Sequence, residues 1–118
     1  MKPGSNKSKR LINNADTIIL SSHAEAFLRT LKVERGVSMN TAESYRRDLV
    51  SFETFLARRA VISSEASTET VRSFMASMSI AGIAPTTMSR RLSALRQYFF
   101  FLVAEEIRSD DPSESIES

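Results

Sequence analysis

The hydrophobic positions of this 118-residue chain predict four amphipathic helices. In four stretches, apolar residues recur at alternating steps of three and four, which places them on one face of a helix. The expected helices run from about Asp16 or Ser22 to Arg35, from Asn40 to the connector that begins at Ala60, from Glu69 to Ala81, and from Pro85 to about Glu106. Their predicted buried stripes are Ala24, Phe27, Leu28 and Leu31; Ala42, Tyr45, Leu49, Phe52 and Leu56; Val71, Phe74, Met75 and Met78; and Met88, Leu92, Leu95, Phe99 and Leu102. The chain is therefore expected to be all-α.

Capping residues are expected where three of these helices begin. Asn40 and Glu43 have the spacing of a capping box, with Asn40 at the N-cap and Glu43 at the third helical position. The other expected caps are Ser67 or Thr68 for the third helix and, behind Pro85, Thr86 or Thr87 for the fourth.

Composition excludes several classes of protein. A chain of 118 residues is the size of one domain and buries a substantial core. It has no cysteine, so disulfides, thiolate metal sites and a cysteine nucleophile are excluded, which fits a reducing, cytoplasmic location. His23 is the only histidine and has no cysteine beside it, so neither a metal nor another cofactor is expected. No apolar run approaches the roughly 20 residues of a membrane span, so no membrane association is expected.

The net charge of +2 hides a strong asymmetry. Residues 105–118 hold six acidic residues against Arg108 alone, whereas residues 1–104 hold 15 basic and eight acidic residues. Residues 1–15 are polar, basic and without period, and are expected to form a flexible leader. A basic body favours an anionic partner, although such a surplus also occurs in proteins that bind nothing anionic.

Two of the predicted helices carry a basic face that lacks acids. On the second helix, one ridge holds Ser44, Arg47, Ser51, Thr54 and Arg58, with Arg46 beside it. On the fourth, Arg90 and Gln97 lie opposite the apolar stripe, and Arg91 and Arg96 flank it. Hydroxyls interleaved with arginines suit the approach to DNA phosphates, and such helices suit the wall of a nucleic-acid groove. The spacing alone is equally compatible with ordinary solvated faces.

Three consecutive phenylalanines, Phe99 to Phe101, predict an exposed aromatic side chain. Successive residues on a helix point about 100° apart, so one small core cannot enclose all three rings. At least one is expected to face a partner or a further helix. This feature, with the methionine-rich third helix, favours an alternative function as a small helical protein–protein interaction module.

Two segments resemble the Xer-type tyrosine recombinases and the phage-type integrases related to them. The first is FLRTLKVERGVSMNTAESYRRDLVSFETFL (Phe27 to Leu56), which resembles the opening helices of that family; its Tyr45-to-Leu49 run, YRRDL, is the most specific part. The second is TTMSRRLSALRQYFFFLVAEEIRSDDPSESIES (Thr86 to Ser118), which is similar to the family's fourth helix and exit linker. Together the resemblance covers about residues 22–118.

The resemblance implies a fold and a role. The fold is the SAM-like core-binding domain, with four main helices in two crossed hairpins forming an orthogonal bundle. The implied boundaries are a leader over 1–15, the helical domain over 16–108, and the start of an interdomain linker over 109–118. In this family the domain clamps one face of the recombination site through its second and fourth helices. The implied partners are double-stranded DNA and other recombinase protomers in a tetrameric synapse, the isolated piece being a monomer.

The resemblance and the basic faces together give a set of candidate DNA-binding residues. Arg90 is expected to contact a base edge, because it lies near the start of its helix, and Arg47 a phosphate, because Ser44 and Ser51 share its ridge. The full set is Thr41, Ser44, Arg46, Arg47, Thr86, Thr87, Arg90 and Arg91.

Catalysis is not expected from this chain. The family uses a tyrosine nucleophile, two arginines, a lysine and a histidine or tryptophan, which lie in a second domain that this sequence lacks. His23 is not followed by the family's histidine-arginine motif, and Tyr45 and Tyr98 lie on or beside an apolar stripe. The longer parent is expected to be a tyrosine recombinase that resolves chromosome dimers or integrates mobile DNA.

Overall fold

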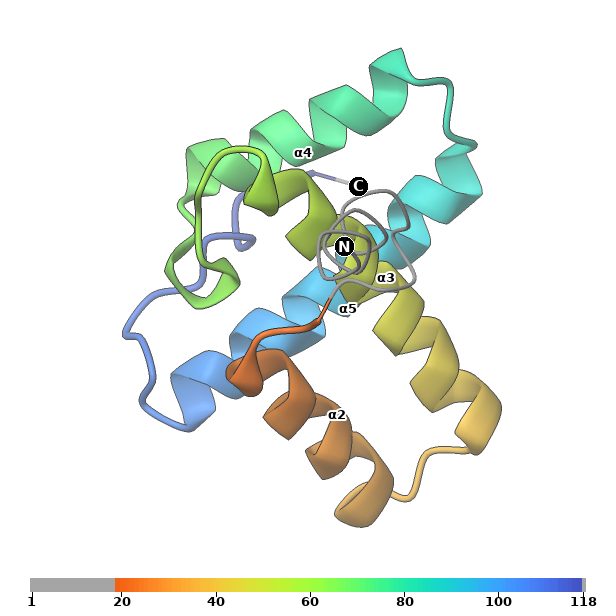
Figure 1. Ribbon diagram of the computed structural model, residues 1–118, viewed down its shortest axis with the longest axis vertical. Coiled ribbons are helices and arrows are strands. Elements are labelled where there is room, and N and C mark those ends of the chain that lie inside the picture. The colour runs from red at the N-terminus through yellow and green to blue at the C-terminus, as the bar shows by residue number, and fades with distance from the viewer. Residues whose placement is uncertain (1–18, 118) are drawn as a thin grey trace, which may run out of the picture.

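The structure is a computed structural model that describes residues 19–117, and within them it is entirely helical (Figure 1). The elements are α2 (Ser22–Val33), α3 (Met39–Ala57), the short 3₁₀ helix η2 (Ser63–Glu65), α4 (Thr68–Ile80) and α5 (Pro85–Ala104). No strand occurs between residues 19 and 117, which confirms the all-α prediction. No helix of this part is both long enough and apolar enough to cross a bilayer. The predicted leader and the alternative helix start at Asp16 lie outside the described residues.

The four main helices form two hairpins that cross, as predicted. The α2–α3 hairpin lies across the α4–α5 hairpin, and α3 and α5 cross near the centre of the molecule (Figure 1). Gly36 and Gly82, which follow α2 and α4, adopt φ values of 64° and 80°. A residue with a Cβ is strained at such angles, so the glycines allow the chain to leave these two helices.

Three serines cap the first three helices. Ser21, Ser38 and Ser67 have extended backbones, and the side chain of each accepts a hydrogen bond from a backbone N–H of the first turn. The prediction of Ser67 was correct, but Asn40 is not the cap of α3. With Ser38 at the N-cap, Asn40 lies inside the first turn, and Glu43 is too far along the helix to complete a capping box.

The predicted threonine caps of α5 are also wrong. Ala84 is the N-cap and makes no side-chain hydrogen bond, while Pro85 occupies the first helical position. Proline pre-sets the helical φ and has no N–H to satisfy, so this helix begins without a polar cap. Thr86 and Thr87 lie within the first turn.

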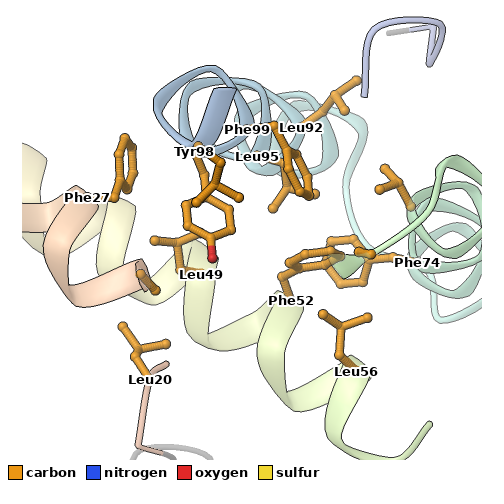
Figure 2. Close-up of a cluster of buried hydrophobic side chains, with 14 of the residues drawn as sticks. Leu20, Phe27, Leu49, Phe52, Leu56, Phe74, Leu92, Leu95, Tyr98 and Phe99 are labelled. Carbon is orange, nitrogen blue, oxygen red and sulfur yellow. The ribbon is translucent and has the colours of Figure 1, made fainter. Parts of the chain in front are cut away.

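The predicted stripes of the four helices meet in one core (Figure 2). All predicted stripe residues are buried except Tyr45, Met75 and Met88, which are partly exposed and pack against its edge. The ring of Phe52 lies at the centre, with its centroid 5.1 Å from that of Phe74 on α4 and 6.2 Å from that of Phe99 on α5. The aromatic edge-to-face contacts therefore join three helices.

A polar cluster that the sequence did not predict joins α2, α3, η2 and α5. The Glu53 carboxylate accepts hydrogen bonds from Ser21 N at 2.9 Å, Ser21 Oγ at 2.7 Å and Ser63 Oγ at 2.6 Å. Ser63 Oγ also lies 2.7 Å from the hydroxyl of the fully buried Tyr98. These bonds satisfy polar groups that would otherwise be costly to bury. They hold η2, which lies within the connector that begins at Ala60, against the helices.

The C-terminal segment, which the sequence predicts to be the start of an interdomain linker, packs against the helices. Pro112 and Ser113 are buried, and Ile116 belongs to the core. Arg96 of α5 donates a hydrogen bond to the carbonyl oxygen of Ile116. The packed unit thus extends beyond residue 108, because one isoleucine within an acidic segment finds an apolar site. The role of 109–118 as the start of an interdomain linker stays a prediction.

Candidate nucleic-acid interface

Two hollows lie along α3, and the N-terminal half of α5 contributes an arginine to each. We call them the Arg91 hollow and the Arg90 hollow. The Arg91 hollow is lined by Glu43, Arg46, Arg47, Val50, Ser51, Thr54 and Arg91. The Arg90 hollow is lined by Asn40, Thr41, Ser44, Tyr45, Asp48, Arg90, Ser93 and Ala94. The crossing of α3 and α5 therefore brings together six of the eight predicted DNA-binding residues.

The remaining two candidates lie elsewhere. Thr86 is exposed and Thr87 is half-buried in the first turn of α5, and neither lines either hollow. Within the hollows, Thr41 and Ser44 supply hydroxyl groups. The Thr41 hydroxyl already accepts a hydrogen bond from Ser38 Oγ at 3.0 Å, so it is held at the first turn of α3.

Arg90 is paired with an acid, which corrects the expectation of an unopposed basic face. Its Nη2 lies 2.6 Å from Asp48 Oδ1, and its Nε lies 3.3 and 3.2 Å from the two carboxylate oxygens. The Asp48 side chain is 3% exposed, whereas that of Arg90 is 48% exposed. The hydrogen bond to Asp48 raises the pKa of Arg90, against the opposing effect of burial.

Arg46 is also paired, with an acid on a different helix. Its Nη1 and Nη2 donate to the two carboxylate oxygens of Glu25 on α2 at 2.9 and 2.8 Å. This bond is the main cause that raises the pKa of Arg46 and lowers the pKa of Glu25. Both side chains are more than a third exposed, so solvent weakens the pair. Its clearest effect is to draw the Arg46 guanidinium towards α2.

Arg47 and Arg91 make no ion pair within residues 19–117. Arg47 is exposed on the outer face of α3. Arg91 is half-buried; its Nη1 lies 3.4 Å from Met78 Sδ, and its Nε is buried without a hydrogen-bond partner. Thr54 Oγ1, in the same hollow, is likewise buried and unpartnered. The Arg91 hollow, which Glu43 also lines, therefore holds two arginines that form no ion pair in the described residues and two buried polar atoms that form no hydrogen bond.

The sequence analysis did not identify Asp48 and Glu25 as the acidic partners of Arg90 and Arg46. Asp48 belongs to the YRRDL run, and it is an acid between Tyr45 and Phe52, two positions of the predicted buried stripe, which is a signal that it needs a cationic partner. Glu25 carries no comparable signal, because its partner lies on a helix whose position the local pattern does not define.

Neither described tyrosine has the setting of a nucleophile. Tyr98 is 0% exposed, and burial raises the pKa of its phenol despite the hydrogen bond between its hydroxyl and that of Ser63, which itself donates to Glu53. Tyr45 is half-buried, with its ring centroid 6.0 Å from that of Phe27. Both rings are part of the packing.

Comparison with known proteins gives consistent matches. The family model described as "Phage integrase, N-terminal SAM-like domain" matches residues 24–106. Over 97 residues the chain is 46% identical to tyrosine recombinase XerD of Brucella abortus and 40% identical to tyrosine recombinase XerD of Rhizobium meliloti. Each alignment covers 82% of this chain and 31% of the relative, so the chain spans about a third of the length of these curated relatives. No solved structure was found to match.

Proposed function

This chain belongs to the family of phage integrase N-terminal SAM-like domains, and on that premise we propose that it is a DNA-binding domain of a site-specific tyrosine recombinase. The relatives are named tyrosine recombinases, and the matched part is their SAM-like domain. The observation that carries the proposal is the Arg91 hollow. There, two arginines without acidic partners stand on an exposed surface made by α3 and α5.

The chemistry of this surface fits duplex DNA. Phosphate contacts come mainly from arginine, lysine and hydroxyl side chains, and five of the seven residues that line the Arg91 hollow are arginines, a serine or a threonine; the other two are Glu43 and Val50. The major groove is about 12 Å wide and admits a helix. In the proposed complex, α3 and the N-terminal half of α5 border the groove, with Arg47 and Arg91 on phosphates.

The Arg90 hollow supplies the contacts that depend on sequence. Arg90 is half-exposed there and is proposed to contact a base edge, while Thr41 and Ser44 donate hydrogen bonds to the backbone. Thr86 and Thr87 reach DNA only if the duplex extends past the hollows to the first turn of α5. Arg46, held by Glu25, contributes less charge than Arg47.

Strand cleavage is proposed to belong to another part of a longer protein. Tyr98 is buried and hydrogen-bonded, and Tyr45 packs against Phe27, so this domain binds and positions the site. The whole protein is proposed to act in the cytoplasm with further recombinase protomers in a tetrameric synapse, in DNA integration or the resolution of chromosome dimers.

The test is a salt titration of binding to a random-sequence duplex, followed by fluorescence anisotropy. Affinity should fall steeply with salt, because each neutralised phosphate contributes about −0.9 to the slope of log K against log salt. Arg47→Ala should weaken binding and reduce the slope by about one.

The matched control is Arg72→Ala on α4, which removes an exposed arginine paired with Glu69 outside both hollows. This variant should bind like the unmodified chain. Equal losses for Arg47→Ala and Arg72→Ala would mean that general charge, and not this surface, drives binding. Absence of duplex binding at low salt would contradict the proposed function.

A second candidate function rests on Phe100, whose side chain is 67% exposed on α5. Contact with a partner protein would bury this ring, so the alternative function is that of a protein–protein interaction module. Binding that requires Phe100 and ignores DNA would favour it.

A further inference from the structure

We propose that Asp48 is a positioning residue for sequence readout: it holds the Arg90 guanidinium so that its free edge faces a guanine in the major groove. This inference rests on the proposed function and deepens it. The observation is that an acid 3% exposed on α3 binds an arginine 48% exposed on α5, within a hollow on the surface proposed to meet DNA.

The hydrogen-bond geometry leaves a specific part of Arg90 free. Asp48 accepts from Nε and from Nη2, which form one side of the planar guanidinium. Both Nη1 hydrogens and the second Nη2 hydrogen make no bond to Asp48. One Nη1 hydrogen and this Nη2 hydrogen point in parallel from the terminal edge of the guanidinium. A pair of parallel donors is what guanine O6 and N7 accept in the major groove. Arg90 can therefore hold Asp48 and a guanine at once.

The burial of Asp48 separates the roles of the two residues. Its carboxylate is almost inaccessible, so it touches no base, and its ion pair with Arg90 offsets its charge, so it repels an approaching duplex less than an unpaired acid would. Its bonds restrict the many rotamers of a long arginine side chain before DNA arrives, which lowers the entropy lost on binding. By contrast, the exposed Arg47 has no such acidic partner within residues 19–117.

The pair also changes how Arg90 contributes to binding. Because Asp48 offsets its charge, Arg90 adds little to the salt-dependent attraction for phosphates. Its contribution appears as discrimination between bases. The two kinds of arginine on this surface are thus distinguishable by measurement: Arg47 sets the salt slope, and Arg90 held by Asp48 sets the sequence preference.

The experiment selects from a library of duplexes with a randomised central stretch, using the 118-residue chain and its variants, and sequences the bound fraction. The unmodified chain should enrich a guanine at one position. Arg90→Ala and Asp48→Asn should each reduce that enrichment about tenfold, within the range for loss of a bidentate base contact. Arg47→Ala should weaken binding overall and leave the preference unchanged.

The salt dependence of binding to random duplex distinguishes the proposed positioning role of Asp48 from a purely structural role. Asp48→Asn leaves the charge of Arg90 uncompensated, so its binding to random duplex should be unchanged or tighter, with a steeper salt slope. Misfolding would weaken both kinds of binding. If circular dichroism shows that Asp48→Asn does not fold, the test is made with Arg90→Lys instead. Lysine keeps the charge but cannot present two parallel donors, so this variant should lose the preference for guanine.

Two results would overturn the inference. One is a sequence preference that survives in Asp48→Asn or Arg90→Lys. The other is an Arg90→Ala variant that loses salt slope as Arg47→Ala does and keeps its preference. A chain that binds no duplex at low salt would instead overturn the proposed function, so the two failures are distinct.

Discussion

Leu95→Ala is the sharpest test of the packing between the two hairpins. Leu95 lies on α5 in the predicted stripe, is 1% exposed, and is part of the cluster in Figure 2. Phe100 is on the same helix but 67% exposed, so Phe100→Ala is a matched control that also truncates a large apolar side chain.

The expected magnitudes follow from burial. Leu95→Ala removes about three methylene equivalents, worth about 0.8 kcal/mol each, or about 2.4 kcal/mol of lost transfer free energy. An unfilled cavity adds to this, so the free energy of unfolding should fall by about 2–5 kcal/mol. In a domain of this size each kcal/mol corresponds to roughly 4–8 °C, so Tm should drop by at least about 8 °C. Phe100→Ala should change the free energy of unfolding by no more than about 0.5 kcal/mol.

The assay is thermal and urea unfolding followed by circular dichroism at 222 nm, the usual helical band. Binding of a fluorescent apolar dye to the native chain should decrease in Phe100→Ala, because the exposed ring is removed. A Tm drop under about 3 °C for Leu95→Ala, or an equal drop for both variants, would refute the placement of Leu95 in the core.

Two further outcomes follow from the tyrosines. Tyr98→Phe should cost about 0.5–1.5 kcal/mol at neutral pH, because it removes one buried hydrogen bond. Burial raises the pKa of Tyr98 above its ordinary value of 10.0, so the free energy of unfolding of the native chain should fall as the pH rises from 10.0 through the raised pKa. Tyr98→Phe should lose less stability over the same pH range. Equal losses for the two proteins in urea titrations would count against this assignment. Incubation with a nicked suicide duplex should give no covalent adduct on a denaturing gel. An adduct abolished by Tyr45→Phe or Tyr98→Phe would place a nucleophile in this chain.

The helices and their buried faces were predictable because they depend on neighbours three and four residues away. The stripes of α2, α3, α4 and α5 followed from spacing, and three consecutive phenylalanines required one to be exposed, which is Phe100. The precise caps were harder to predict. Several Ser, Thr and Asn residues near the start of α3 can each cap a helix, and the choice of Ser38 over Asn40 depends on where the preceding chain enters.

Only the tertiary structure decided which arginines are paired with an acid. Spacing placed Arg90 and Arg46 on polar faces, but their acidic partners are 42 and 21 residues away in sequence. Ile116 likewise enters the core from an acidic segment whose local pattern predicts a linker. Helical periodicity reports which face of a helix is apolar, but it carries no information on which helix that face meets. Only the crossing of the hairpins brings Asp48 to Arg90 and leaves Arg47 and Arg91 without acidic partners in the part of the chain described here.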